Sequence, residues 1–143
     1  MPDLWFIRTD GSELTWRAIR SDPSVKVIVW GSGAGWCGPC RSEAPRMSDL
    51  HDRYASQGVF VIESLFEDEY RNRASADYAR QWETELRCNH TVTAEPDPPY
   101  GEADAIPMLW VIDAETMRIA AYANGLESGV ESAIRSVLDG STR

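Results

Sequence analysis

Two cysteines separated by two residues are the part of this sequence with the clearest chemistry. Cys37 and Cys40 lie in the run Trp-Cys-Gly-Pro-Cys at residues 36–40. This spacing lets two thiols form and reopen one disulfide where a strand leads into a helix. A helix that begins at Cys37 would place its sulfur at unpaired N-terminal amides, which stabilise a thiolate, with Cys40 one turn further in. We therefore predict that Cys37 attacks and Cys40 resolves.

The residues around this pair resemble those of known redox proteins. Trp-Cys-Gly-Pro-Cys is the active-site signature of thioredoxins, and Ile106-Pro107 stands where that fold carries its cis-proline loop. Residues 40–45, Cys-Arg-Ser-Glu-Ala-Pro, resemble the Cys-x-x-Glu-x-Pro run of TlpA/ResA-type (redoxin-like) thiol-disulfide oxidoreductases. The resemblance implies an α/β thioredoxin fold with a central mixed β-sheet flanked by helices. It also implies an N-terminal β-hairpin extension, and an α/β insertion between the active-site helix and the cis-proline loop.

The resemblance further implies which residues meet the substrate. In thioredoxin-like proteins the cis-proline loop abuts the disulfide, and the backbone before the proline pairs with an extended substrate chain. This predicts a cis peptide bond at Pro107 and substrate contact through Ile106. Trp36 is predicted to be a contact surface for protein substrates, and Gly38 and Pro39 border the sulfurs in the same motif.

The residue that would accept the Cys40 proton in thioredoxins is missing from this sequence. Many thioredoxins carry a buried aspartate in the strand before the motif, but residues 27–30, Val-Ile-Val-Trp, contain no carboxylate. Glu63 interrupts a mostly apolar strand, near the position of the lysine that faces that aspartate in thioredoxins. Glu43 matches the glutamate of the TlpA/ResA run, one turn beyond Cys40. Either is a candidate general base, and a carboxylate without a catalytic role is the alternative for each.

The elements that must position these residues follow from the pattern of apolar residues. Residues 4–9 and 13–16 read as two strands around the turn pair Asp10-Gly11, and 27–30 and 59–62 read as buried parallel strands. Helical spacing predicts the active-site helix up to Gly58, a second helix around Trp82 and a last helix before Gly140. The remaining predicted strands are a short one near residues 90–93 and a hairpin pair at residues 108–113 and 119–123.

The glycine-rich stretch before the motif allows several interpretations. Residues 31–35 look like a loop insertion that either adds mobility beside the disulfide or is merely tolerated. Residues 33–38 also satisfy the G-x-G-x-x-G dinucleotide pattern, but Trp36 and Cys37 would fill the place where a pyrophosphate approaches the backbone. We expect the side chains of Trp30 and Trp36 to line the active site.

Length and charge limit the class of protein. The chain has 143 residues, which fits one thioredoxin-like domain over residues 1–143. Fourteen basic and 23 acidic residues give a net charge of −9, which argues against nucleic acid as a partner. We find no basic leader and no run of about 18 apolar residues that would span a membrane. The expected location is cytoplasmic if the chain is complete, and periplasmic or membrane-anchored if a leader was trimmed.

The remaining cysteine and the histidines carry less specific signals. Cys88 and His90 have a Cys-x-His spacing, but no second ligand pair has a finger-like spacing, so we predict no metal and no organic cofactor. Cys88 is expected to be a small, at least half-buried residue, with a third redox thiol as the alternative. His51 and His90 are expected at the surface or in packing.

We therefore predict a monomeric thiol-disulfide oxidoreductase that reduces protein disulfides through a reversible Cys37–Cys40 disulfide, with electrons from another thiol oxidoreductase. The Gly-Pro pair between the cysteines matches the reducing members of the family. One alternative is a redoxin-type thiol peroxidase, although Ala34 stands where peroxiredoxins carry Thr or Ser. The other is a non-catalytic thioredoxin-like binding module.

Overall fold

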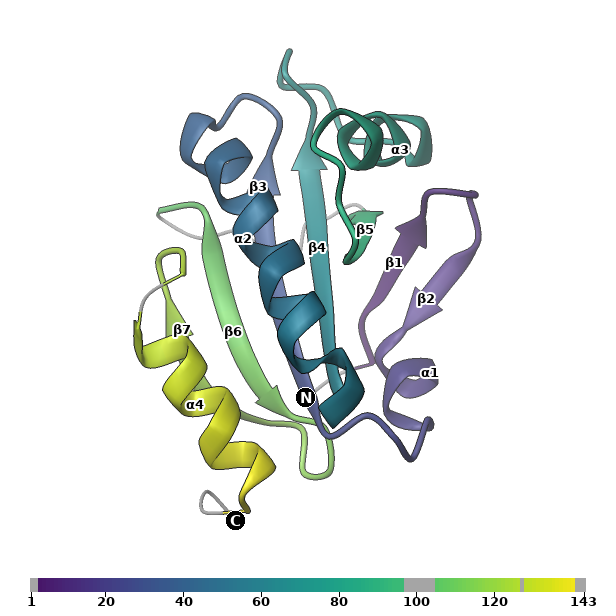
Figure 1. Ribbon diagram of the computed structural model, residues 1–143. Helices are drawn as coiled ribbons and strands as arrows, with labels where there is room; N and C mark the ends of the chain where they lie inside the picture. The colour runs from purple at the N-terminus through teal and green to yellow at the C-terminus, as the bar shows by residue number, and fades with distance from the viewer. Residues whose placement is uncertain (1–2, 97–104, 127, 141–143) are drawn as a thin grey trace.

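A single mixed sheet organises the chain. The computed structural model describes residues 3–96, 105–126 and 128–140. Within these ranges seven strands form one sheet in the order β2-β1-β5-β4-β3-β6-β7 (Figure 1). The strands are β1 (Trp5–Arg8), β2 (Glu13–Thr15), β3 (Val27–Ala34), β4 (Val59–Glu67), β5 (Thr91–Ala94), β6 (Met108–Asp113) and β7 (Arg118–Ala123). The helices are α1 (Trp16–Arg20), α2 (Gly38–Tyr54), α3 (Ala76–Glu85) and α4 (Ser128–Leu138), and a 3-10 turn, η1 (Ala55–Gln57), follows α2.

Strand pairing confirms the predicted thioredoxin-like arrangement. β3, β4 and β5 run parallel, whereas β6 pairs antiparallel with both β3 and β7. β1 and β2 form the predicted antiparallel hairpin, whose turn contains Gly11 with a φ of +87°. The predicted α/β insertion is α3 and β5, and β5 pairs with β4 on one side and β1 on the other.

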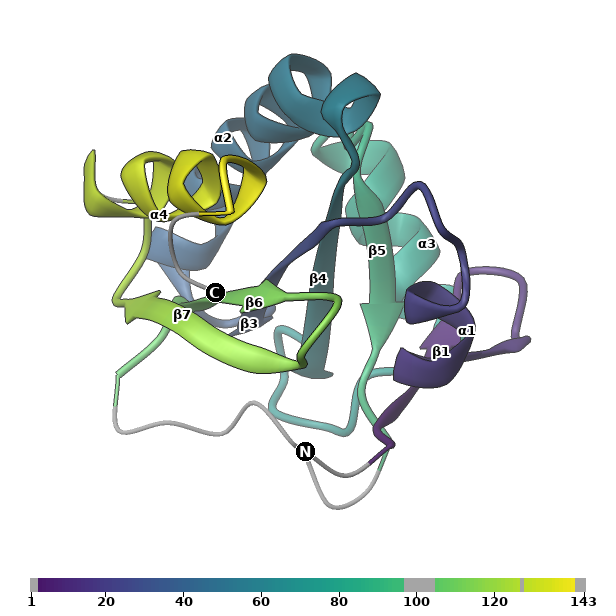
Figure 2. The same ribbon diagram turned by 90° about the horizontal axis from the view of Figure 1, so that it is seen from below.

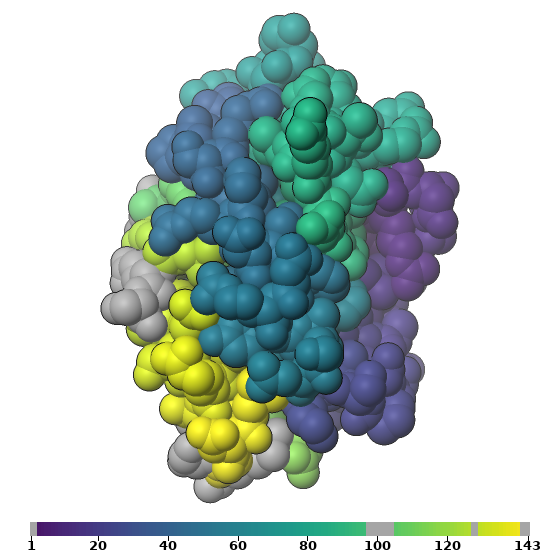
Figure 3. All heavy atoms as spheres, in the orientation of Figure 1, coloured from purple at the N-terminus to yellow at the C-terminus, as the bar shows by residue number. Residues whose placement is uncertain are grey.

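Alternation of side chains along β3 gives the sheet two apolar faces. Val27 and Val29 point towards α2 and α4, where they pack in a cluster with Met47 and Ile134. Figure 2 shows α2 and α4 laid over this face, and Figure 3 shows the two helices next to each other at the surface. Ile28 and its even-numbered neighbours point to the opposite face, where they pack with Phe6 of β1 and with residues of α1. The helix that carries the cysteines is therefore fixed by burial along most of its length.

Trp30 does not line the active site, so that prediction is wrong. Its ring lies on the face opposite α2, in edge contact with Phe6 and Trp16 and stacked on Trp110 at 4.5 Å between ring centroids. The indole Nε1 donates a hydrogen bond to Ser64 Oγ at 2.8 Å. The period of two along a strand places Trp30 on the other side of the sheet from the cysteines.

Residues 31–34, which make up most of the predicted loop insertion at residues 31–35, belong to a strand instead. β3 continues through Ala34 with all eight residues buried. A Cβ on Gly31 would lie 2.7 Å from Met47 Cε, and one on Gly33 would lie 3.0 Å from Cys40 Sγ. Glycine occurs here because α2 approaches the strand closely, which is a common reason for glycine within a sheet.

One helix was not predicted. Trp16 begins α1 instead of ending a strand, and the side chain of Thr15 accepts a hydrogen bond from the Ala18 amide at 3.0 Å. Threonine is a good N-cap residue, but five helical residues are too few to give a recognisable apolar period.

Candidate active site

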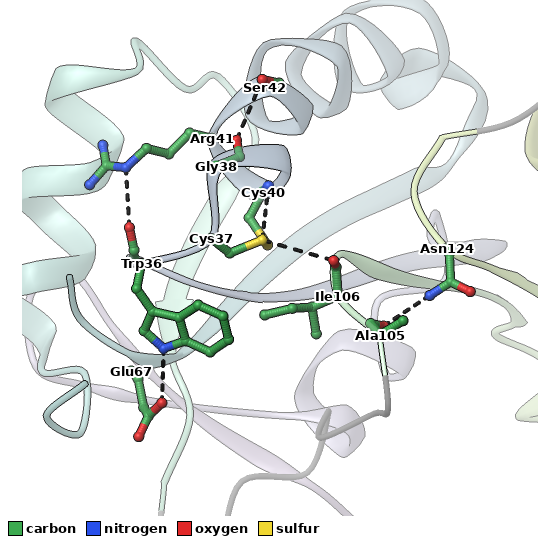
Figure 4. Close-up of a disulfide and its surroundings, with 11 residues drawn as sticks. Trp36, Cys37, Gly38, Cys40, Arg41, Ser42, Glu67, Ala105, Ile106 and Asn124 are labelled. Carbon is green, nitrogen blue, oxygen red and sulfur yellow. Dashed lines mark hydrogen bonds between the residues drawn. A yellow bond between two sulfur atoms is a disulfide. The ribbon is translucent and has the colours of Figure 1, made fainter. Parts of the chain in front are cut away.

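The cysteine pair occupies the junction between β3 and α2. Cys37 is the N-cap residue of α2, with an extended backbone at φ −94° and ψ 107°, and its sulfur accepts a hydrogen bond from the Cys40 amide at 3.2 Å. The two residues form a disulfide with Cα atoms 5.2 Å apart (Figure 4). The predicted helix start is therefore confirmed, and Cys37 Sγ lies at the positive end of the helix dipole.

The two sulfurs are not equally accessible. Cys37 is 5% exposed and Cys40 is 1% exposed. Cys40 lies behind Cys37, with its side chain packed close to Gly33. A partner disulfide approaching from solvent therefore meets Cys37 first.

The cis-proline loop lies against the disulfide. The Ile106–Pro107 peptide bond is cis, as predicted, and the Ile106 carbonyl oxygen lies 3.9 Å from Cys37 Sγ. Asn124, in the turn after β7, donates a hydrogen bond from Nδ2 to the Ala105 carbonyl oxygen at 2.9 Å (Figure 4). In the sequence, Asn124 appears only as the first residue of an Asn-Gly turn pair. Its partner in the cis-proline loop is 19 residues away, so no local pattern indicates this contact.

Trp36 presents a fixed aromatic surface next to the cysteines. Its side chain is 36% exposed, and its Nε1 donates to Glu67 Oε1 at 2.9 Å (Figure 4). The Arg71 guanidinium lies 4.1 Å from the ring centroid, and Phe66 makes an edge contact with the ring. These contacts hold the indole in one orientation at the rim of the site.

Arg41 connects the first turn of α2 to α3. Its Nε donates to the Gly35 carbonyl oxygen at 3.2 Å, and one terminal nitrogen donates to the Tyr78 hydroxyl at 3.3 Å. The guanidinium also lies 5.0 Å from the centroid of Trp82. Tyr78 and Trp82 lie in α3, far along the chain, so the sequence alone gave no sign of these two contacts.

Gly35 is a residue at which adding a single methyl group should lower stability. A Cβ at this position would lie 2.1 Å from the Tyr78 hydroxyl and 2.6 Å from the Glu69 amide nitrogen. We expect Gly35→Ala to lower the free energy of unfolding by about 3 kcal/mol, at the upper end for overpacking, because backbone must move. Urea denaturation measures this. Gly129→Ala is the matched control, since a Cβ there meets nothing within 4 Å, and equal loss in both variants would contradict the close-packing argument.

Glu43 is buried at the side of the active-site helix. It is 6% exposed, and its carboxylate accepts a hydrogen bond from the Leu126 amide, while Arg46 lies 3.7 Å away. Burial raises the pKa of Glu43 above its ordinary value of 4.5. The Leu126 amide and Arg46 oppose this shift, and the charge of Glu63 adds to it. The carboxyl group therefore holds a proton more readily than an exposed glutamate does.

Glu63 is buried on the same side of the sheet. It pairs with Gly31 in the β3–β4 ladder and is 3% exposed. Its Oε1 accepts a hydrogen bond from Trp82 Nε1 at 3.0 Å and lies 2.8 Å from His90 Nε2. The structure thus brings both predicted carboxylates to the α2 face of the sheet, each held by groups other than the cysteines.

A third buried carboxylate was missed. Glu95 is 0% exposed and accepts hydrogen bonds from Ser32 Oγ at 2.9 Å and Ser64 Oγ at 2.6 Å. In sequence it opens a proline-rich stretch that resembles a surface loop, so its burial was not predictable. Because Ser32 and Ser64 are even-numbered neighbours in their strands, Glu95 lies on the face opposite Cys40.

Two curated proteins match parts of this chain, and no protein-family model matches it. Thioredoxin H2-2 of Oryza sativa subsp. japonica is 39% identical over 70 residues, which cover 49% of this chain and 46% of that protein. Thiol-disulfide oxidoreductase ResA of Oceanobacillus iheyensis is 38% identical over 42 residues, which cover 29% of this chain and 22% of that protein. The match thus spans less than half the length of either relative.

Solved structures match the chain over nearly its whole length. A thiol:disulfide interchange protein of the thioredoxin family from Chlorobium tepidum has a TM-score of 0.72 at 20% identity, covering 96% of this chain and 94% of its own. A secreted thiol-disulfide isomerase from Corynebacterium glutamicum has a TM-score of 0.74 at 23% identity, covering 97% and 85%. The exposed lipoprotein thioredoxin Etrx1 from Streptococcus pneumoniae has a TM-score of 0.71 at 20% identity, covering 97% and 99%. The chain therefore has the thioredoxin fold, and it resembles ResA-type thiol-disulfide oxidoreductases.

Proposed function

We propose that this chain is a thiol-disulfide oxidoreductase that reduces protein disulfides. The observation that carries the proposal is the Cys37–Cys40 disulfide at the N-terminus of α2, with the Ile106 carbonyl 3.9 Å from Cys37 Sγ. In the reduced protein the Cys37 thiolate attacks one sulfur of a substrate disulfide and displaces the other as a thiolate. Cys40 then attacks Cys37 Sγ, which releases the second substrate thiol and closes the disulfide. A donor thiol oxidoreductase returns the two electrons.

The surface around the sulfurs supports a protein substrate. An extended substrate segment would pair with the backbone of Ile106, next to the cis bond at Pro107, in the manner of strand addition. Trp36 lies on one side of the motif and gives a large apolar contact, and Gly38 and Pro39, between the two buried cysteines, are exposed. A Cβ on Gly38 meets nothing within 4 Å, so the approach above that residue is open among the described residues.

Glu43 is our preferred acceptor for the Cys40 proton. The support is its position one turn beyond Cys40, its burial, and a pKa raised by that burial towards neutral pH, where a general base works best. Glu63, the other predicted candidate, stays a prediction, because its Oε1 accepts a hydrogen bond from Trp82 Nε1 and also lies 2.8 Å from His90 Nε2. Glu63→Gln compared with Glu43→Gln separates the two assignments.

Insulin reduction tests the proposed reaction most simply. With dithiothreitol as electron donor, the protein should accelerate reduction of the insulin disulfides, read as precipitation of the B chain, and Cys37→Ser should remove the acceleration. Peroxide consumption with the same donor is the parallel assay for the peroxidase alternative. Peroxide turnover without insulin reduction would overturn the proposal, and inactivity in both assays would favour the binding module.

The proposal also covers the natural partners of the protein and the cellular compartment in which it acts. No described helix has the length and apolar character needed to cross a membrane. Two neighbours are described as secreted or as an exposed lipoprotein, which supports an extracytoplasmic site of action. We propose that a monomer acts there on disulfide-containing proteins and receives electrons from another thiol oxidoreductase.

A further inference from the structure

We propose that Glu63, Cys88 and His90 form a zinc site beneath the active-site helix. The carboxylate oxygen, thiol sulfur and imidazole nitrogen of these residues all lie within 4.8 Å of one another. This site uses neither Cys37 nor Cys40, and Glu43, our preferred acceptor of the Cys40 proton, is not one of its ligands.

Strand pairing brings the three residues together. Glu63 lies in β4, His90 directly precedes β5, and Cys88 lies between α3 and β5. The parallel register pairs Ile62 with Thr91, so the start of β5 lies beside Glu63. The Cys-x-His spacing gave two ligands in the sequence, and the third is 25 residues earlier, where no spacing rule would find it.

The donor set suits zinc. Zinc is bound in proteins by thiolate, imidazole and carboxylate groups, and sites with three protein ligands leave a fourth position for water. A thiolate and a carboxylate together cancel the charge of Zn²⁺, which a buried ion requires. Magnesium and calcium prefer oxygen ligands alone, so a site with sulfur and imidazole disfavours them.

The surrounding groups are already arranged to orient the ligands. Ser48 Oγ, on α2, lies 2.8 Å from His90 Nδ1 and accepts a hydrogen bond from the Asn89 amide at 2.9 Å. Its hydroxyl oxygen has room for a second donor, so Nδ1–H can donate to Ser48 while Nε2 presents its lone pair to the metal. Trp82 Nε1 holds Glu63 Oε1 from the other side at 3.0 Å. Outer hydrogen bonds of this kind are typical of histidine and carboxylate metal ligands.

Binding must displace a proton from Cys88. Zn²⁺ would replace the proton and form a zinc–thiolate bond, and one proton would leave to solvent. Cys88 is half-buried, and His90 is 2% exposed, so the ion would enter past Cys88.

Cobalt titration of the disulfide form tests the site. Co²⁺ substitutes for Zn²⁺ and gives a thiolate-to-metal absorption band in the near ultraviolet, and closing the Cys37–Cys40 disulfide removes the other two sulfurs. We expect one Co²⁺ per chain, displaced by one equivalent of Zn²⁺. Cys88→Ser should lose the band, whereas His51→Gln, which changes the histidine outside the cluster, should keep it.

A second variant separates metal binding from folding. Ser48→Ala leaves all three ligands in place and should weaken Co²⁺ binding by about 10- to 100-fold, with the band still present at saturation. Absence of stoichiometric binding by the folded disulfide form, or an unchanged band in Cys88→Ser, would overturn the site. Neither result would affect insulin reduction, so the two proposals fail separately.

Discussion

Replacing Cys40 by serine should trap this chain in a covalent complex with its disulfide substrate. Cys37 can still attack and form the mixed disulfide, but no thiol remains at position 40 to displace the substrate. Turnover should fall on the order of 10³-fold or more, the scale seen when an enzyme loses a residue that acts with its nucleophile. The complex should appear as a mass increase equal to the substrate, which dithiothreitol removes.

The companion variants identify the attacking residue. Cys37→Ser should form no complex, because Cys40 is 1% exposed and lies behind Cys37. Cys88→Ser should react like the unchanged protein, since its thiol is outside the pair. A complex formed equally well by Cys37→Ser would show that Cys40 can attack and would reverse the assigned order.

Glu43→Gln should have the second largest effect on the reaction. If Glu43 accepts the Cys40 proton, its loss should slow release of the mixed disulfide by about 100-fold near neutral pH. The rate in the unchanged protein should rise with pH through the raised pKa of Glu43, because a base acts only when deprotonated. Stopped-flow measurements from pH 4 upwards would record this pH profile, with Asp49→Asn as the exposed control on α2. Identical pH profiles in Glu43→Gln and Asp49→Asn would contradict the assignment.

The same carboxyl group should also make stability depend on pH. The pKa of Glu43 is higher in the folded chain than its ordinary value of 4.5, so the folded state binds the proton more tightly. Its contribution is therefore greatest below pH 4.5 and is lost as pH rises through the folded value. Arg46 and Glu63, the charged groups near the Glu43 carboxyl, are unchanged in Glu43→Gln. The free energy of unfolding of this variant, measured with urea, should therefore depend less on pH over this range.

Local signals allowed most of the architecture to be predicted. The Asp10-Gly11 turn, the apolar runs that became β3 and β4, and the four-residue spacing through Trp82 each depend on neighbours in sequence. The cis bond at Pro107 followed from the resemblance to thioredoxins. These features correspond to short-range rules of backbone geometry and apolar period, so sequence reasoning found them.

What was missed depends on contacts between distant residues. Gly31 and Gly33 looked like a loop because glycine usually marks one, whereas here it admits α2 against the strand. Trp30 was assigned to the wrong face because an uninterrupted apolar run does not show which side chains point to which layer. Asn124 and Glu95 have partners that lie 16 or more residues away in the sequence, and no local pattern reveals such pairs.

The most direct test of the redox claim is a thiol count across a series of dithiothreitol redox buffers, read by alkylation and mass spectrometry. We expect one reversible step that involves two thiols, located by peptide mapping at Cys37 and Cys40, with Cys88 alkylated or protected equally throughout. The midpoint potential would place the protein among disulfide reductants or oxidants. The absence of such a step, or a step that requires Cys88, would contradict the assignment of Cys37 and Cys40 as the redox pair.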